Sequence, residues 1–262
     1  MCHNDSPIFP VSGGAPVEEA DLFIEVENIS SLPVFLATPE RTPAPGVLLI
    51  SDIYGPGEFY RDLARRLAGA GFMTALPDLF FRLEPTSDES TRDEVRTRNA
   101  QLDQTQALED IRATLTWLKH HQRGTGKLGT LGFCMGGTLA MLAAGRQPNP
   151  DASVAFYGFP KRQRTPLNPV LASDEAEVSG LESPLLAFWG DQDKGVGMDN
   201  VEAYREAVTR YHKAHDFIIY PGVGHAFLTF DPEADSYAAS QDAWARTLEF
   251  LGLHLDRPHY RD

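Results

Sequence analysis

The stretch that decides the fold is Gly126-Lys-Leu-Gly-Thr-Leu-Gly-Phe-Cys134-Met-Gly-Gly137-Thr-Leu-Ala-Met-Leu-Ala-Ala144. Its first part suits a short strand, and its last part is apolar, rich in alanine and suited to a helix. Between them, residues 132–136 follow the pattern G-x-S-x-G with cysteine in place of serine. This pattern is typical of a sharp strand-to-helix turn whose central residue is a strained, exposed nucleophile. The backbone N–H groups after Cys134 would favour a thiolate or an oxyanion there.

The segments around this turn alternate between predicted strands and helices. The apolar run 47–51 predicts a buried strand, residues 59–67 have helical spacing, and 72–76 predicts the next strand, which together indicate a parallel sheet. Further strands are predicted at 22–28, 32–38, 152–158, 184–190 and 216–220, and further helices around 102–121, 201–211 and 244–251. We expect an α/β fold, a mostly parallel central sheet flanked by helices, with residues 1–20 as an irregular leader and residues 21–262 as a single domain.

Composition excludes several classes of function. The chain of 262 residues has 23 basic and 37 acidic residues, a net charge of −14. Because phosphate binding needs clustered Lys and Arg, we expect no nucleic-acid partner. No apolar run is long enough to span a membrane and no secretory signal is visible, so a cytoplasmic location is expected. The two cysteines are Cys2 and Cys134, and Cys134 is expected to be a free thiol.

Motifs for metals and nucleotides are missing from the sequence. There is no H-E-x-x-H or C-x-x-C pattern, and Gly126-Lys127 is followed by Leu128 rather than by the Ser or Thr of a P-loop. Cys2-His3 alone supplies too few ligands for a site. We therefore expect no metal and no cofactor, and a monomer that acts on a small molecule.

Four residues that can carry chemistry follow predicted strands: Asp52, Cys134, Asp193 and His225. In a parallel sheet, ligands bind beyond the carboxyl ends of the strands, so these side chains are expected to meet. Cysteine, aspartate and histidine also occur in the chain order nucleophile, acid, histidine, which is that of the α/β-hydrolases. The sequence thus predicts a catalytic triad of Cys134, Asp193 and His225.

Each member of the triad has a predicted role. His225 would take the thiol proton and later return it to the leaving group, while Asp193 orients the imidazole. Asp191 is the alternative partner of the histidine, and Asp193 is preferred to it because of the family resemblance described below. The backbone N–H groups of Met135 and Ile53 would hold the oxyanion. An inert buried thiol and a redox-sensing thiol are the other interpretations of the cysteine.

Five stretches together resemble the dienelactone hydrolase family of α/β-hydrolases. They are Leu48-Leu-Ile-Ser-Asp-Ile-Tyr-Gly55, Pro77-Asp-Leu-Phe80, Gly132-Phe-Cys-Met-Gly-Gly137, Trp189-Gly-Asp-Gln-Asp193 and Gly224-His-Ala-Phe227. The resemblance covers roughly residues 22–253 and is most specific in the cysteine at the turn. It implies hydrolysis of a small carboxylate-bearing lactone, in the known case a dienelactone opened to maleylacetate during the breakdown of aromatic compounds.

The resemblance also implies roles for charged residues. An arginine of the family that holds the substrate carboxylate corresponds to Arg92, although most charges in residues 80–100 are expected to be solvated. The glutamate of the family that contacts the resting thiol corresponds to Asp52, which is one methylene shorter. A second arginine, four residues after the histidine, is replaced by Thr229, so half of the carboxylate clamp is expected to be missing.

The sequence therefore predicts a hydrolase that opens small lactones or esters through a thioester on Cys134. A general small carboxylesterase of the same fold is one alternative. A ligand-binding protein of this fold without catalytic activity is the other.

Overall fold

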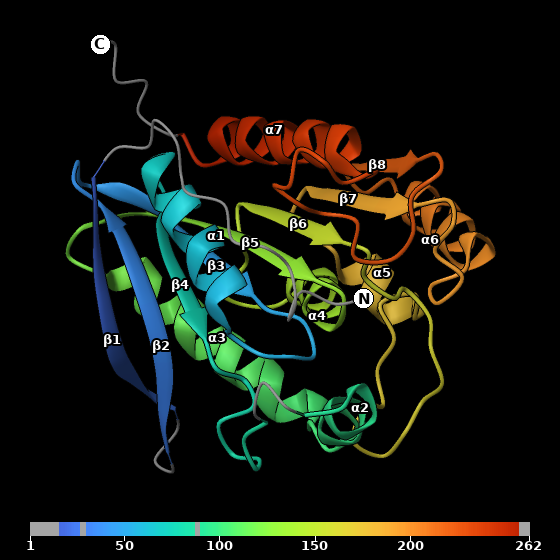
Figure 1. The fold of residues 1–262 in the computed structure, drawn as a ribbon, viewed down its shortest axis with the longest axis horizontal. Coiled ribbons are helices and arrows are strands. Elements are labelled where there is room, and N and C mark those ends of the chain that lie inside the picture. The colour runs from blue at the N-terminus through green and yellow to red at the C-terminus, as the bar shows by residue number, and fades with distance from the viewer. Residues whose placement is uncertain (1–15, 27–29, 87–89, 257–262) are drawn as a thin grey trace.

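The computed structural model describes residues 16–26, 30–86 and 90–256. The strands of this part of the chain form one sheet in the order β1-β2-β4-β3-β5-β6-β7-β8 (Figure 1). Their bounds are β1 Val17–Val26, β2 Ser30–Pro39, β3 Ala44–Ile50, β4 Met73–Pro77, β5 Gly124–Phe133, β6 Ala152–Phe156, β7 Leu185–Gly190 and β8 His215–Tyr220. β2 is antiparallel to both β1 and β4, and the remaining pairs are parallel. The predicted mostly parallel sheet is confirmed.

Helices cover both faces of this sheet. They are α1 Glu58–Gly69, α2 Arg92–Ala100, α3 Gln104–His120, α4 Met135–Ala143, α5 Glu175–Gly180, α6 Met198–Arg210 and α7 Tyr237–His254. On β3, Gly46 faces Leu118 of α3, whereas a side chain at Gly129 of β5 would meet Leu251 of α7. Figure 1 accordingly shows α7 above the sheet and α3 and α4 below it. Because both faces are covered, every residue of β3, β4, β6 and β7 is buried.

The first strand begins earlier than its sequence indicates. Residues 17–20 were expected to belong to an irregular leader, but they are the start of β1. Val17 is opposite Pro39 and Ala20 is opposite Leu36 in the antiparallel pair with β2. Pairing with a neighbouring strand thus extends a segment whose own residues have little strand preference. The rest of the predicted leader, residues 1–15, lies outside the described residues.

The charge-rich segment 80–100 contains a well-defined helix. The Thr91 side chain accepts from the N–H of Glu94, and the Glu94 carboxylate accepts from the N–H of Thr91, which is a capping box at the start of α2. Val95 is the buried residue of this helix. α2 lies beneath the carboxyl ends of β3 and β5 in Figure 1. Among the helices of the described residues, none is long and apolar enough to cross a lipid bilayer.

Candidate active site

The turn at Cys134 has the strained geometry that the glycine pattern predicts. Cys134 joins β5 to α4 with φ 55° and ψ −115°, a positive φ that few residues other than glycine adopt. A Cβ atom at Gly132 would lie 2.0 Å from the carbonyl oxygen of Gly136, and one at Gly136 would lie 2.4 Å from that of Ile50. Both glycines are therefore required for strand and helix to pass so closely.

Cys134 lies at a cavity of about 720 Å³ beyond the carboxyl ends of the strands. The thiol residue is only 5% exposed, so a substrate must enter the cavity to reach it. The cavity is lined by Ile53, Arg92, Arg96, Asn99, Cys134, Met135, Phe159, Lys161, Arg162, Gln163, Gln192, Asp193, Lys194, Gly195, Asn200 and His225. All three members of the predicted triad are in this set.

Asp193 and His225 form a hydrogen-bonded pair. The Nδ1 atom of His225 is 2.7 Å from Oδ2 of Asp193, and because a carboxylate can only accept, this nitrogen carries the proton. Oδ1 of Asp193 accepts from the N–H groups of Gly195 and Val196 at 3.0 and 3.1 Å. The Asp193 side chain is fully buried. Its orientation therefore keeps Nε2 of the histidine available as a proton acceptor.

The alternative acid, Asp191, has a different environment. Oδ1 of Asp191 accepts from the N–H of Gly222 at 2.8 Å and from the side chain of Gln192 at 3.0 Å. Asp191 is exposed and stabilises the turn after β8. The structure thus pairs His225 with Asp193, the acid that we predicted.

The predicted oxyanion donors also line the cavity. Ile53 follows β3 and Met135 is the first residue of α4. In the described part of the chain, neither backbone N–H has an acceptor. Two such N–H groups next to the nucleophile are suited to a developing oxyanion.

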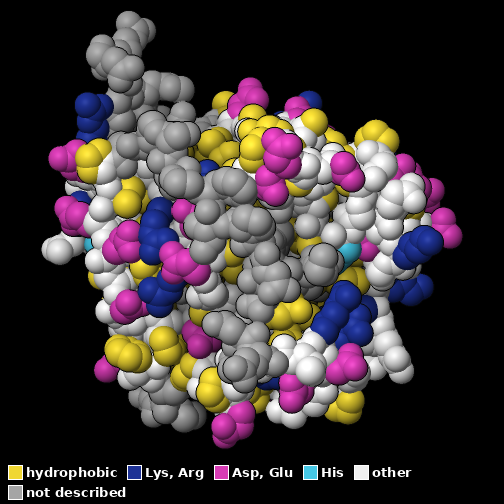
Figure 2. Space-filling model, viewed as in Figure 1, with side chains coloured by type: hydrophobic (Ala, Val, Ile, Leu, Met, Phe, Trp, Pro, Cys, Tyr) yellow, Lys and Arg dark blue, Asp and Glu magenta, His cyan; other side chains and the backbone are white. Residues whose placement is uncertain are grey.

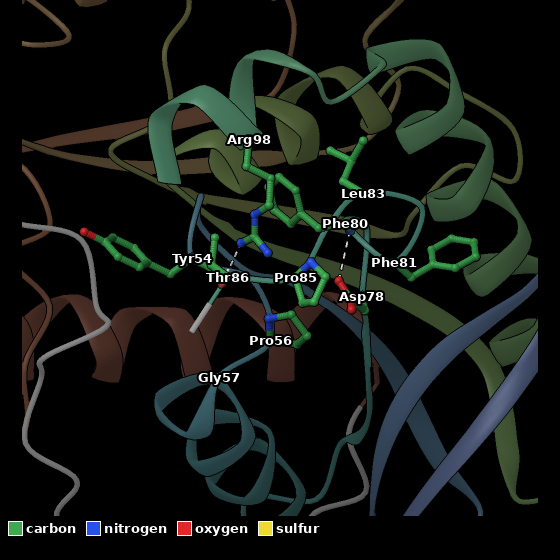
Figure 3. Close-up of a pocket in the computed structure, with 10 residues that line it drawn as sticks. All are labelled: Tyr54, Pro56, Gly57, Asp78, Phe80, Phe81, Leu83, Pro85, Thr86 and Arg98. Atoms are coloured by element: carbon green, nitrogen blue, oxygen red, sulfur yellow. Dashed lines mark hydrogen bonds between the residues drawn. The ribbon is translucent and has the colours of Figure 1, made fainter. Parts of the chain in front are cut away.

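Arg98 of α2 supports the loop that carries Ile53. Its Nη2 atom donates to the carbonyl oxygens of Ile53 and Tyr54 at 3.2 and 3.0 Å. Its guanidinium lies 4.4 Å from the ring centre of Phe80, and these groups border a second cavity of about 430 Å³ (Figure 3). Burial raises the pKa of Asp78 in this cavity and lowers the pKa of Arg98, while the attraction between the two opposes both shifts. Sequence analysis did not single out Arg98.

Asp52 is a buried residue that stabilises the same loop by a hydrogen bond. It is 0% exposed, and its Oδ1 atom accepts from the N–H of Tyr54 at 2.9 Å. Asp52 is not among the residues that line the cavity. Its predicted contact with the resting thiol stays a prediction.

Cationic side chains dominate the charge of the cavity. Arg92, Arg96, Lys161, Arg162 and Lys194 line it. Among the described residues of the lining, Asp193, already paired with the histidine, is the single acidic one. Figure 2 shows a group of Lys and Arg side chains beside a histidine, whereas acidic side chains are spread around the same face. On a chain of net charge −14, this distribution favours an anionic ligand at this place.

The sequence analysis identified one of these cations, Arg92, and missed the others. Arg92 is the first residue of α2 and is exposed at the cavity. Lys161 and Arg162 come five and six residues after β6 ends, so the rule that selects residues beyond strand ends could have found them. Thr229, at the position of the second arginine of the family, does not line the cavity. Its N–H donates to the hydroxyl of Ser240 at 3.0 Å.

Comparisons with known proteins identify the family of this chain. The model of the dienelactone hydrolase family matches residues 32–255. A carboxymethylenebutenolidase of Rhodococcus opacus is 30% identical over 260 residues, which are 97% of this chain and 98% of that protein. A Bradyrhizobium protein that carries the name of a 2-oxo-3-(5-oxofuran-2-ylidene)propanoate lactonase is 34% identical over 87% of this chain and 92% of its own.

A solved structure supports the same assignment. A Klebsiella pneumoniae protein that carries a dienelactone hydrolase name superposes with a TM-score of 0.83 at 26% identity, covering 90% of this chain and 99% of the other. The chain has the α/β-hydrolase fold and belongs to the dienelactone hydrolase family of hydrolases.

Proposed function

We propose that this enzyme opens a small carboxylate-bearing lactone through a covalent thioester on Cys134. The observation that carries the proposal is the cavity itself. It brings together a cysteine at a strained turn, a histidine held by a buried aspartate, two backbone N–H groups without acceptors among the described residues, and a cationic lining. These groups correspond to a nucleophile, a base, an oxyanion site and an anion-binding region.

The chemistry follows from the hydrogen bonds. Nε2 of His225 takes the proton of the Cys134 thiol, and the thiolate attacks the lactone carbonyl carbon. The carbonyl oxygen becomes an oxyanion that accepts from the N–H groups of Ile53 and Met135. The ring C–O bond then breaks, His225 protonates the departing oxygen, and a thioester remains. Water, deprotonated by the same histidine, cleaves the thioester and releases the hydroxy acid or its keto tautomer, with the thiol restored.

The charge of the cavity supports a substrate that carries a carboxylate. Arg92 forms no ion pair within the described residues, so its guanidinium is available to a ligand and suited to bidentate contact with a carboxylate. The names of two relatives, a carboxymethylenebutenolidase and a furanylidene propanoate lactonase, describe lactones that carry an acidic group. A lactone of this class is the substrate that we propose here.

The first test measures turnover of dienelactone and of neutral esters by wild type and Cys134→Ala. We expect the variant to lose turnover and to keep the thermal midpoint of wild type. Rapid acid quenching followed by intact mass measurement should find an adduct equal to the full mass of the lactone, because acylation by ring opening expels no atom. Turnover that survives in Cys134→Ala would refute the thioester mechanism.

The alternatives give different results. A small carboxylesterase would hydrolyse neutral esters as well as the charged lactone, and a binding protein without catalysis would bind lactone and turn over neither. A redox-sensing thiol would react with iodoacetamide independently of His225, whereas the hydrolase predicts that His225→Ala slows this labelling. The labelling should be followed on the Cys134 peptide, so that reaction at Cys2 is not counted.

The role of Arg92 requires a matched pair of substrates. Dienelactone and its methyl ester have the same ring, and they differ in the carboxylate charge. For Arg92→Ala we expect kcat/KM of dienelactone ring opening to fall about tenfold, the effect of a lost charge-assisted hydrogen bond in a partly exposed site, and that of the methyl ester to stay unchanged. Equal losses on both substrates would refute the clamp.

A further inference from the structure

Arg162 is a cation of the active-site cavity that no family correspondence suggests. It lies in the segment between β6 and α5 and lines the same cavity as Cys134. Arg162 is half-buried, whereas Arg92 and Lys161 are exposed. It is therefore the least exposed of the described cations that line this cavity.

The segment that carries Arg162 is attached firmly to α3. Gln104, the first residue of α3, is 1% exposed, and its side chain exchanges two hydrogen bonds of 2.9 Å with the backbone of Val170. The N–H of Gln104 also donates to the carbonyl oxygen of Leu167 at 2.8 Å. Asn168 lies between these anchors, and its Nδ2 atom donates to the carbonyl oxygen of Leu102 at 3.3 Å. The segment is thus held in place before any ligand arrives.

Asn168 in turn holds the guanidinium. Nη2 of Arg162 donates to Oδ1 of Asn168 at 2.7 Å, which orients the group without neutralising it. The Nε atom of Arg162 is buried and has no hydrogen-bond partner within the described residues. A buried charged donor without a partner costs free energy, which an anionic ligand would recover.

Two other arginines behave differently. Arg164, two residues further along, forms an ion pair with Asp174, and Arg146 forms one with Glu177. No carboxylate of the described residues pairs with Arg162. Burial lowers the pKa of Arg162, and ionised Cys134 nearby opposes that shift, but a guanidinium stays protonated at neutral pH. Arg162 is therefore a preoriented positive charge with no anion of its own.

We propose that Arg162 binds the substrate carboxylate as the inner half of a clamp whose outer half is Arg92. This inference rests on the proposed function and names the residue that replaces the arginine missing at position 229. The two arginines come from different elements, α2 and the segment after β6, and both line the cavity. Because Arg162 is the less exposed cation, it discriminates more strongly than Arg92 between charged and neutral lactones.

The test compares Arg162→Met, Arg162→Lys and the control Arg164→Gln on dienelactone and its methyl ester. For Arg162→Met we expect kcat/KM on dienelactone to fall on the order of 10- to 100-fold, the effect of a lost charge-assisted hydrogen bond, and less than threefold on the methyl ester. Arg162→Lys should recover part of this loss, since it restores charge without the planar fork. Arg164→Gln should have the same ratio of kcat/KM for dienelactone to kcat/KM for the methyl ester as wild type, because Arg164 is not among the residues that line the cavity.

A second measurement does not depend on turnover. Iodoacetate and iodoacetamide alkylate the same thiol and differ in charge, so the ratio of their rates at Cys134 reports cations beside the sulfur. We expect this ratio to fall at least tenfold in Arg162→Met and to be unchanged in Arg164→Gln. If wild type turned over no lactone and the ratio still fell, the proposed function would fail and the anion site would stand.

Two outcomes would overturn the inference. Equal losses on dienelactone and its methyl ester, with slower iodoacetamide labelling, would mean that Arg162 acts on the thiolate rather than on the substrate. An unchanged alkylation ratio in a variant with the thermal midpoint of wild type would mean that Arg162 binds no anion at all. If Arg162→Met did not fold, the same measurements would be made on Arg162→Lys. The clamp would be overturned if this variant kept the wild-type ratio of kcat/KM for dienelactone to kcat/KM for the methyl ester, and if adding Arg92→Ala to it had the same effect as in wild type.

Discussion

Replacing Asp193 by asparagine should inactivate the enzyme through the tautomer of one imidazole. In the wild type, Oδ1 of Asp193 accepts two backbone N–H groups, from Gly195 and Val196, and Oδ2 accepts Nδ1–H of His225. Asparagine has one oxygen, and it is most stable at the Oδ1 position, where it accepts from the N–H groups of both Gly195 and Val196. Its NH₂ group then faces His225, so Nδ1 must become the acceptor and the proton moves to Nε2. In this tautomer Nε2 cannot take the proton of the thiol.

The size of the effect follows from the same contacts. In the opposite orientation the amide oxygen would accept from His225, as the active tautomer requires, but the NH₂ group would face two backbone N–H groups. Each of these donors would lose its acceptor at a cost of about 1–3 kcal/mol, so this active orientation is roughly 2–6 kcal/mol higher in free energy. The corresponding change in a serine protease lowers kcat about 10⁴-fold, equal to about 5.5 kcal/mol. We expect a loss on the order of 10³- to 10⁴-fold for Asp193→Asn.

The assay is the initial rate of dienelactone ring opening at saturating substrate, with the thermal midpoint as the test of folding. Asp191→Asn is the matched control. It makes the same chemical change two residues away, where the oxygen retains its bond to Gly222, and we expect the activity of wild type. Activity of Asp193→Asn within tenfold of wild type, or an equal loss in Asp191→Asn, would refute the assignment of the acid.

Three further changes test the turn, the supporting arginine and a pH dependence. Gly136→Ala should lower the midpoint of thermal unfolding by many degrees or prevent folding, because its Cβ would lie 2.4 Å from the backbone oxygen of Ile50. Arg98→Met should lower kcat on the order of tenfold with little change in KM, since it releases the carbonyl of Ile53. Burial and a nearby arginine lower the pKa of His121 below its ordinary 6.5, so its protonation opposes folding. His121→Gln should therefore lose less stability than wild type as pH falls from 8 to 5.

The first change has a control variant, and each of the other two has an outcome that would contradict it. Gly180→Ala adds the same methyl group where, apart from its own helix and chain neighbours, no described residue has a heavy atom within 4 Å, and it should fold normally. For Arg98→Met, an unchanged kcat would mean that the oxyanion loop needs no support from α2. For His121→Gln, a difference in unfolding midpoint from wild type that is the same at pH 5 and at pH 8 would contradict the lowered pKa of His121. These midpoints are measurable by calorimetry on full-length protein.

The sequence by itself determined the sheet, the turn and the chain order of the triad. These features are local: buried strands are continuous apolar runs, and the turn at Cys134 needs glycine at 132 and 136 because backbone passes within van der Waals distance of backbone. The side chains of the predicted triad lie in the loops that follow strands, and parallel strands end at one edge of the sheet. Local patterns therefore predict that Cys134, His225 and an acid, Asp191 or Asp193, meet at this edge of the sheet, and the family resemblance favours Asp193.

Only the tertiary structure decided which charged groups meet there. Asp191 and Asp193 are two residues apart. The N–H groups of Gly195 and Val196 hold the buried Asp193 carboxylate beside His225, whereas the N–H of Gly222 holds the exposed carboxylate of Asp191 at another turn. Arg162 reaches the cavity because Gln104, in another element, holds its segment by hydrogen bonds. Val17 joins a strand because a neighbouring strand offers hydrogen bonds. These features depend on contacts between residues far apart in the chain, which the local spacing of residues cannot predict.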